Sequence, residues 1–260
     1  YFKGLVEAYS TAKDDEKLKD IILNLYKFSM SGPWPESWLI EKAEEFNINT
    51  LEELNKTKWV EILKDNIRVE VEGFINMYHK AIEIISDTEG LEAYLDTFRG
   101  DLECLENVYE SLNYGLSEIY AALNGVVFTK LKTVRKSAVS DENAQGTVKS
   151  IRDTVKKKVK SLIEDSFTFT PEESLQGIKD VYPYMKELSR ITLDFLDKFN
   201  EKKREKNLLD FNDLEHLCLK ILIDRDENNN IIPSGVAEHF KEFFDEVLVD
   251  EYQDSNNVQE

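Results

Sequence analysis

The sequence predicts a mainly α-helical protein with a small β contribution near its C-terminal end. Only 10 Gly and 5 Pro occur among 260 residues that are rich in Glu, Lys and Leu, a composition that favours helices over a turn-rich β protein. Apolar residues recur at spacings of three and four along most of the chain, which is the period of an amphipathic helix. The clearest exception is the β-branched run Val247-Leu248-Val249.

Helices follow one another through the first half of the chain. Asp14-Asp15-Glu16 is an acidic helix start, and a break at Ser31-Gly32-Pro33 ends that helix. Thr50 precedes Glu53 by three residues, which predicts a capping box. Apolar stripes then predict helices over residues 18–30, 36–46, 58–85 and 91–123. The last two are expected to pack as an antiparallel hairpin or bundle.

The second half alternates between helices and irregular segments. Residues 125–146 are polar and turn-like, with a short extended stretch at 126–128. Pro171 suits the first turn of a helix, and Pro183 predicts that another helix begins near Val181. Further helices are expected over residues 147–166, 210–222 and 234–244, with a loop at 224–230.

Composition excludes several classes of protein. Two cysteines and no CxxC motif argue against a disulfide scaffold or a zinc site. No apolar run approaches the length of a membrane span, and no secretory leader follows Tyr1. We therefore expect a cytoplasmic protein that is part of something longer. The formal net charge of −19 argues against a general nucleic-acid coat, although charge can be distributed unevenly.

The apolar run near the C-terminal end is followed directly by Asp250-Glu251. Ligands of parallel sheets sit beyond the carboxyl ends of the strands, so acids placed there meet a nucleotide's phosphates and Mg²⁺. Asp250 can hold Mg²⁺, which prefers hard oxygen ligands, and Glu251 can accept a proton from an attacking water. The alternative is a solvated acidic loop, since the chain contains 52 Asp and Glu residues.

The residues around these acids resemble a known family. Residues 248–256, with the sequence LVDEYQDSN, are similar to motif II of the UvrD/Rep-type superfamily 1 DNA helicases. Residues 210–214, with the sequence DFNDL, are similar to the element that precedes motif II in that family. The segments YKFS at 26–29 and PWPESWL at 33–39 resemble the AddA (RexA) family of subunits of bacterial ATP-dependent helicase–nucleases.

This resemblance implies a fold and an activity. It implies that residues 1–206 form a helical insert domain of the 1B type, and that residues 207–260 are the returning part of a RecA-like α/β ATPase domain, called 1A, ending in the motif II strand. It implies ATP and Mg²⁺ as cofactors, with Asp250 as the metal ligand, Glu251 as the general base, and Gln253 and Asp254 in supporting roles near the nucleotide. No GxxxxGK[ST] occurs in the 260 residues, so the chain alone is expected to be inactive.

The resemblance also implies partners and a pathway. Members of the family unwind and process double-strand DNA ends for recombinational repair. The expected partners are therefore double-stranded ends, single-stranded DNA and a second, AddB (RexB)-like subunit. Two alternatives stay open. One is a helical protein-interaction module in which the acidic motif is a fortuitous loop. The other is a UvrD/Rep-type helicase that has a large insert and no nuclease.

A basic island stands out in this acidic chain. Ten basic residues face three acidic ones between Lys130 and Lys160, so this window carries a net charge of +7 and the rest carries −26. The spacing of Lys149, Arg152, Lys156 and Lys160 places them on one helix face, which could follow DNA phosphates without reading sequence. Lys157 adds to the predicted DNA contacts. The alternative is a solvated basic face that pairs with acidic helices of the same chain.

Overall fold

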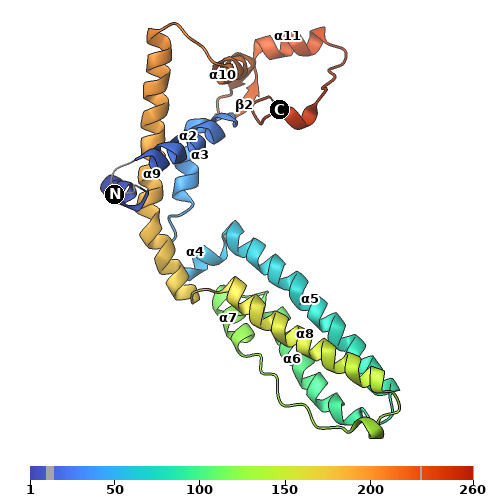
Figure 1. Cartoon of the computed structure of the whole chain (residues 1–260). Helices are drawn as coiled ribbons and strands as arrows, with labels where there is room; N and C mark the ends of the chain where they lie inside the picture. The colour runs from blue at the N-terminus through green and yellow to red at the C-terminus, as the bar shows by residue number, and fades with distance from the viewer. Residues whose placement is uncertain (10–14, 229, 260) are drawn as a thin grey trace. The chain divides into compact units, whose positions relative to one another are not determined.

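The computed structural model describes residues 1–9, 15–228 and 230–259, and these are mainly helical, as the sequence predicts (Figure 1). The chain divides into two compact units, which are considered separately. Unit 1 contains residues 1–47 and 179–260, and unit 2 contains residues 48–178. Unit 2 is therefore one continuous segment inserted between the two segments of unit 1. This differs from the predicted boundary at residue 206, because residues 1–47 group with the C-terminal segment.

Unit 2 is a bundle of helices around one core. Helix α5 (Lys58–Asp87) packs against α6 (Leu95–Ser111) and α8 (Glu142–Ser166), both of which run antiparallel to it (Figure 1). The shorter elements are α4 (Leu51–Asn55), η1 (Glu92–Tyr94), α7 (Leu116–Asn124) and η2 (Lys136–Ala138). The predicted helix over 91–123 is interrupted between α6 and α7. Gly115 there forms the N-terminal cap of α7, and Asn55 accepts a hydrogen bond from the Leu116 amide at 2.9 Å.

Local sequence signals explain several helix ends in unit 2. The predicted capping box at Thr50 is confirmed, because its hydroxyl accepts a hydrogen bond from the Glu53 amide and the Glu53 carboxylate accepts one from the Thr50 amide. The apolar stripe of α5 turns inward and includes fully buried Ile67, Tyr78 and Ile85. Periodicity therefore predicts the buried face of this helix correctly.

A buried ion pair joins the three long helices of unit 2. Asp101 of α6 is 2% exposed and Arg152 of α8 is 8% exposed. The Arg152 Nε lies 2.6 Å from Asp101 Oδ2, and Nη2 lies 3.3 Å from Oδ1. The hydroxyl of Tyr78, on α5, donates to the same carboxylate at 3.0 Å. Burial and the neighbouring Asp101 raise the pKa of Tyr78, so its hydroxyl stays protonated and can donate.

Unit 1 begins with helices α1 (Phe2–Tyr9), α2 (Glu16–Met30) and α3 (Pro35–Glu44). Its second segment includes α9 (Pro171–Glu205), which starts in unit 2 and belongs to unit 1 from Lys179 on. Tyr26 of α2 packs edge-on against Phe195 and Phe199 of α9, with ring centroids 5.2 and 5.8 Å apart. These aromatic contacts anchor α2 to α9.

Helix α9 is continuous through Pro183, so the prediction of a new helix near Val181 is wrong. A proline inside a helix removes one backbone hydrogen bond, and the surrounding contacts must compensate. On either side of Pro183, the side chains of Tyr182 and Lys186 contact Glu44 of α3, at 2.7 and 3.2 Å. The Ser189 hydroxyl also donates to the carbonyl of Leu39 at 2.8 Å. Packing on α3 thus holds the helix together where local sequence predicts a break.

The end of unit 1 combines two helices with a small hairpin. Helix α10 (Phe211–Leu222) leads into strand β1 (Ile223–Arg225), which pairs antiparallel with β2 (Ile231–Pro233), and α11 (Gly235–Phe243) follows. Asp226 closes the turn by accepting hydrogen bonds from the amides of Asn228 and Asn230. Ser234 caps α11. The predicted loop and the two predicted helices are confirmed.

The predicted strand at residues 247–249 is not formed. Val247, Leu248 and Val249 have no regular structure and are 75%, 89% and 62% exposed. A strand needs neighbouring strands to satisfy its backbone groups, and β1 and β2, the only strands in the described ranges, pair with each other. The apolar run has the composition of a buried strand but no sheet to join here. Within the same ranges, no helix combines the length and apolar character needed to cross a membrane.

The turn at Gly90 generates a prediction about stability. Gly90 has φ +92°, and a Cβ atom there would lie 2.0 Å from the carbonyl oxygen of Ala138. We expect Gly90→Ala to lower the free energy of unfolding by about 1–3 kcal/mol from backbone strain, with the steric clash adding to the loss. Urea denaturation of both proteins measures the difference.

A matched control is Gly73→Ala in α5, because a Cβ atom at Gly73 meets nothing within 4 Å. That change should raise the free energy of unfolding by about 0.5–1 kcal/mol, since it removes a flexible residue from a helix interior. Equal effects at the two glycines would contradict the assignment of the Gly90 turn.

Candidate functional site

The acidic motif lies at a sharp turn of the backbone. Glu251 has φ 54°, a left-handed conformation that is uncommon for a residue with a large side chain. The chain turns there from the extended run at 247–249 into the short helix η3 (Tyr252–Asp254). The Asp250 carboxylate accepts a hydrogen bond from the Glu251 amide at 2.9 Å, and Gln253 donates to the Glu251 carboxylate. The turn thus brings together three of the four predicted nucleotide-site residues.

The two acids have the donor chemistry that Mg²⁺ requires. Asp250 and Glu251 are both exposed, so their carboxylate oxygens are accessible. Mg²⁺ is typically held by one or two carboxylates plus waters and substrate phosphates, and these acids fit that pattern. Across residues 1–9, 15–228 and 230–259, no group of three or more His, Cys, Asp or Glu side chains could hold a metal by itself. The side chain of Asp254 lies outside the described residues.

A contact that sequence reasoning missed ties the motif to α10. The Glu215 carboxylate accepts hydrogen bonds from the side-chain amides of Asn256 and Gln259, at 2.9 and 2.8 Å. Val258, between these two residues, is 8% exposed. The two segments that resemble helicase motifs, 210–214 and 248–256, are thereby connected through one carboxylate. No local pattern marks Glu215, because its partners are more than 40 residues away.

The helix start at Asp210 forms a second polar cluster. Asp210 and Asp213 make a reciprocal capping box, as the sequence predicts for the start of α10. Lys203, only 8% exposed, contacts both carboxylates, with Nζ 2.9 Å from Asp210 and 2.6 Å from Asp213. Burial by itself would raise the pKa of the Asp210 carboxyl, but the hydrogen bond and charge of Lys203 outweigh it and lower this pKa.

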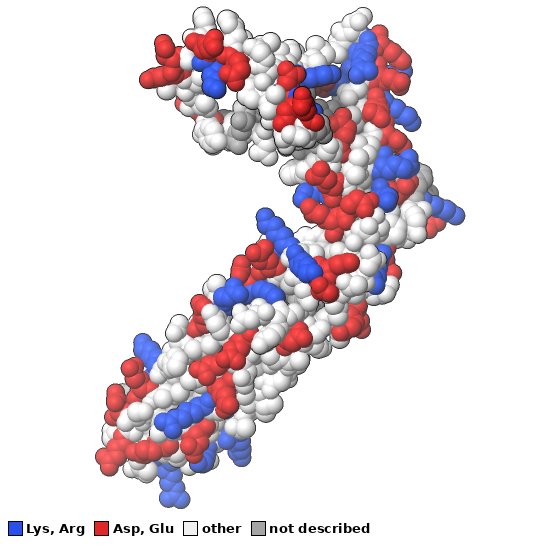
Figure 2. Space-filling view, turned by 180° about the vertical axis from the view of Figure 1, so that it is seen from behind, with Lys and Arg blue, Asp and Glu red and all other residues white. Residues whose placement is uncertain are grey.

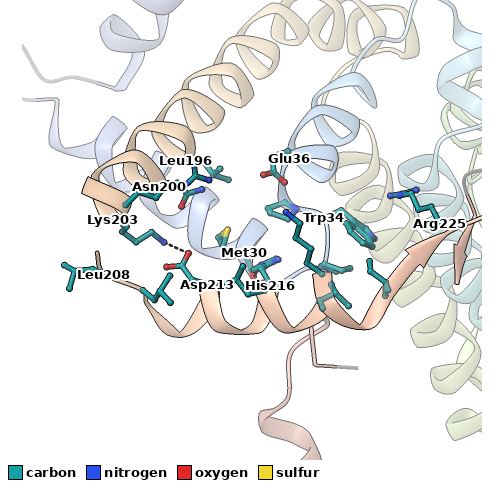
Figure 3. Close-up of a pocket in the computed structure, with 18 of the residues that line it drawn as sticks. Met30, Trp34, Glu36, Leu196, Asn200, Lys203, Leu208, Asp213, His216 and Arg225 are labelled. Atoms are coloured by element: carbon teal, nitrogen blue, oxygen red, sulfur yellow. Dashed lines mark hydrogen bonds and ion pairs between the residues drawn. The ribbon is translucent and has the colours of Figure 1, made fainter. Parts of the chain in front are cut away.

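A pocket of about 850 Å³ borders this cluster (Figure 3). Lys203 points toward Asp213 on one side of it, and Trp34 and Arg225 lie close together on the other, 5.6 Å from guanidinium carbon to ring centroid. His216 lies between them, with Nε2 3.0 Å from the carbonyl oxygen of Met30. Since His216 connects α10 to the end of α2 in this way, its role is structural.

The predicted basic face lies along α8 of unit 2. Lys149, Lys156, Lys157 and Lys160 are all exposed, as a phosphate-binding surface requires. Some basic side chains of this region pair with acids: Lys160 lies 3.6 Å from Glu164, and Lys158 lies 3.9 Å from Glu70. Figure 2 shows acidic and basic side chains interspersed over the face in view. Exposed pairs of this kind contribute about 0–1 kcal/mol each and are readily exchanged for other partners.

Arg152 does not belong to that exposed face, which corrects the prediction that it contacts DNA. Its guanidinium is buried against Asp101 and also donates to the carbonyl of Thr129 at 2.6 Å. Burial opposes its charge, but the hydrogen bond and charge of Asp101 prevail and raise the pKa of Arg152. Spacing placed Arg152 beside the lysines correctly, and the side chain turns inward because its acidic partner lies in the core.

The comparisons with known proteins come out as the motifs predict. The UvrD/REP helicase N-terminal domain family matches residues 18–260. Proteins named as the A-type subunit of an ATP-dependent helicase/nuclease, from Clostridium botulinum (strain Alaska E43 / Type E3) and Clostridium beijerinckii, are 52% identical to the chain over 259 residues. The protein of the same name from Clostridium perfringens (strain SM101 / Type A) is 49% identical over 259 residues.

These alignments cover 100% of this chain but 20–21% of each relative. The chain therefore spans about a fifth of the length of the curated relatives it matches. The predicted resemblance is confirmed by both the family match and these relatives.

The Lys203 cluster predicts a specific pH dependence. Because the pKa of Asp210 is lowered in the folded state, its ion pair stabilises the protein above the pKa of the unfolded state, and this contribution is lost as the pH falls through the folded value. Asp210→Asn keeps a good N-cap and removes the charge, so we expect a loss of about 1 kcal/mol at neutral pH. The difference from wild type should shrink progressively below about pH 4.

Urea denaturation between neutral pH and pH 3 measures this difference. Asp245→Asn is the control, because it removes an equally charged but exposed side chain. A difference for Asp210→Asn that stayed constant with pH would exclude an ionic role for this residue.

Proposed function

The chain belongs to the UvrD/REP helicase family, and from this premise we propose that it is part of an ATP-dependent DNA helicase–nuclease. The parent protein couples ATP hydrolysis to unwinding and processing of double-strand DNA ends for recombinational repair. The relatives' name, which joins a helicase and a nuclease in one subunit, supports the nuclease and a partner subunit of the AddB (RexB) type. The observation that carries the proposal is the exposed pair of acids at the turn of Glu251.

In this proposal the acids of the turn have separate roles. Asp250 would hold the Mg²⁺ that neutralises charge on the ATP phosphates. Glu251 accepts the proton of the attacking water, and its carboxylate is oriented for this by the hydrogen bond from Gln253. Gln253 and Asp254 lie next to the nucleotide. Hydrolysis also requires a phosphate cradle, and no GxxxxGK[ST] occurs in these 260 residues, so the rest of the parent protein supplies it.

The order of the two units supports a domain assignment. Unit 2 corresponds to the helical 1B insert, because it is a continuous segment between the two segments of unit 1. Unit 1 corresponds to part of the RecA-like domain 1A. In the parent protein, the exposed run at 247–249 joins a parallel sheet, which covers its apolar side chains and pairs its backbone groups.

The exposed lysines of α8 contribute DNA contacts in this proposal. Lys149, Lys156, Lys157 and Lys160 contact phosphates, which gives binding without sequence preference, as a translocating motor needs. Arg152 is excluded from this set because it is buried.

The role of Glu251 is tested by Glu251→Gln in the full-length parent protein. The substitution keeps the size of the side chain but removes the proton acceptor. We expect ATP turnover to fall at least about 100-fold while ATP binding is retained. Glu246→Gln is the control, because it changes an exposed acid just before the apolar run. Near-normal turnover in Glu251→Gln would remove Glu251 from the mechanism.

The DNA contacts are tested by changing Lys149, Lys156 and Lys160 together to Gln in the 260-residue chain. Fluorescence anisotropy should show weak, salt-sensitive binding by the wild type. The variant should bind less tightly, and the slope of log affinity against log salt should be smaller by about 2–3, because each lost phosphate contact removes roughly one counterion.

The matched control changes three other exposed lysines of unit 2, Lys56, Lys58 and Lys80, to Gln. It alters the net charge equally, so a similar loss of binding in both variants would show general attraction rather than a DNA-binding face.

A further inference from the structure

The segment that connects α7 to α8, residues 125–141, is basic and is called the strap below. No Asp or Glu occurs from residue 119 to residue 140, whereas four basic residues lie between 130 and 136. The strap has little regular structure and passes along the helices of unit 2 on its way to the start of α8 (Figure 1). Its apolar side chains pack on the core: Val126, Phe128, Leu131, Val134 and Val139. Lys130, Lys132 and Arg135 are exposed.

Side chains of α8, rather than a neighbouring strand, hold the backbone of the strap. Arg152 donates to the carbonyl of Thr129 at 2.6 Å, and Gln145 donates to the carbonyl of Val134 at 3.2 Å. The end of the strap is fixed separately, by a hydrogen bond from the Ser140 amide to the carbonyl of Glu89 at 3.0 Å. The exposed cations therefore lie on a backbone that is attached at three places.

The two anchors on α8 are themselves buried and oriented. Gln145 is 2% exposed, and its amide also donates to the Tyr94 hydroxyl at 3.2 Å. Arg152 is fixed by the two hydrogen bonds to Asp101, and Tyr78 orients that carboxylate from the other side. An arginine offers several donors in a rigid planar fork, so it can pair with Asp101 and hold the strap at the same time.

The anchors lie next to the exposed lysines of the same helix. Lys149 follows Gln145 by four residues, and Lys156 follows Arg152 by four, so each lysine lies about one turn beyond a buried anchor on the same side of α8. The strap therefore runs along the flank from which these lysines project. Lys149 also lies over the ring of Tyr94, which contacts Gln145.

We propose that Arg152 is a positioning residue that holds the basic strap beside Lys149 and Lys156, so that cations of the strap and of α8 form one surface for DNA phosphates. Through Thr129, the buried pair with Asp101 places Lys130 and Arg135. The inference rests on the proposed function for its ligand, and it adds the strap and its anchor to the DNA-binding face.

The decisive variant is Arg152→Lys in the 260-residue chain. Lysine keeps the charge opposite Asp101, and the net charge is unchanged, but it lacks the fork that reaches Thr129 as well. We expect amides of residues 126–135 to exchange with deuterium about tenfold faster while the helices of unit 2 keep their protection. Affinity for a fluorescein-labelled DNA duplex should fall about tenfold in low salt, with a salt slope smaller by about 1–2.

Arg68→Lys is the matched control, because it makes the same substitution in a surface ion pair of unit 2, with Asp65. It should change neither strap exchange nor DNA affinity. Gln145→Met removes the second anchor without touching the buried ion pair, and it should move both measurements in the same direction if Arg152→Lys does not fold.

The outcomes separate this inference from the function on which it rests. Faster strap exchange with unchanged affinity and salt slope would overturn it, while loss of binding in the triple lysine variant would still support the DNA-binding face. Weaker binding without faster strap exchange would also overturn it, because Arg152 would then act by another route. A wild-type chain that binds no duplex contradicts the proposed function, and Arg152 is then purely structural.

Discussion

The buried pair between Asp101 and Arg152 is the interaction on which unit 2 most depends. One carboxylate and one guanidinium connect α6 to α8, Tyr78 adds α5, and Thr129 adds the strap. A charge this deeply buried is stable only if its partner and hydrogen bonds are complete, and removing one member leaves the other uncompensated. The bundle and the basic segment along it are therefore fixed by the same few polar atoms.

Unit 1 is organised around contacts that prepare a site rather than complete one. The acids of the motif lie on a turn, and Glu215 holds the following residues against α10. The apolar run before the turn is exposed, because the described part of the chain contains no sheet with a free edge for it. This is physically consistent with a chain that spans about a fifth of its relatives' length, since burial of such a run depends on strands that are distant in sequence.

Opposite charges have different tasks in the two units. In unit 1, Lys203 neutralises the two carboxylates at the start of α10 and thereby stabilises a helix end that lies 37 residues before Val247. In unit 2, the basic residues divide into a buried anchor and exposed lysines, although their spacing along α8 is regular. Charge in this protein is thus partly structural even where the sequence pattern is typical of nucleic-acid binding.

The sequence by itself determined the helical class, most helix positions, the capping boxes at Thr50 and Asp210, and the family, because these depend on periodicity and on short motifs. Only the tertiary structure decided that α9 continues through Pro183, that Arg152 turns inward, and that Glu215 holds the segment after the acids. Each of these depends on a partner from another helix or a distant segment. Local sequence records the preference of each residue, but it does not record which distant group will satisfy a buried charge or replace a lost hydrogen bond.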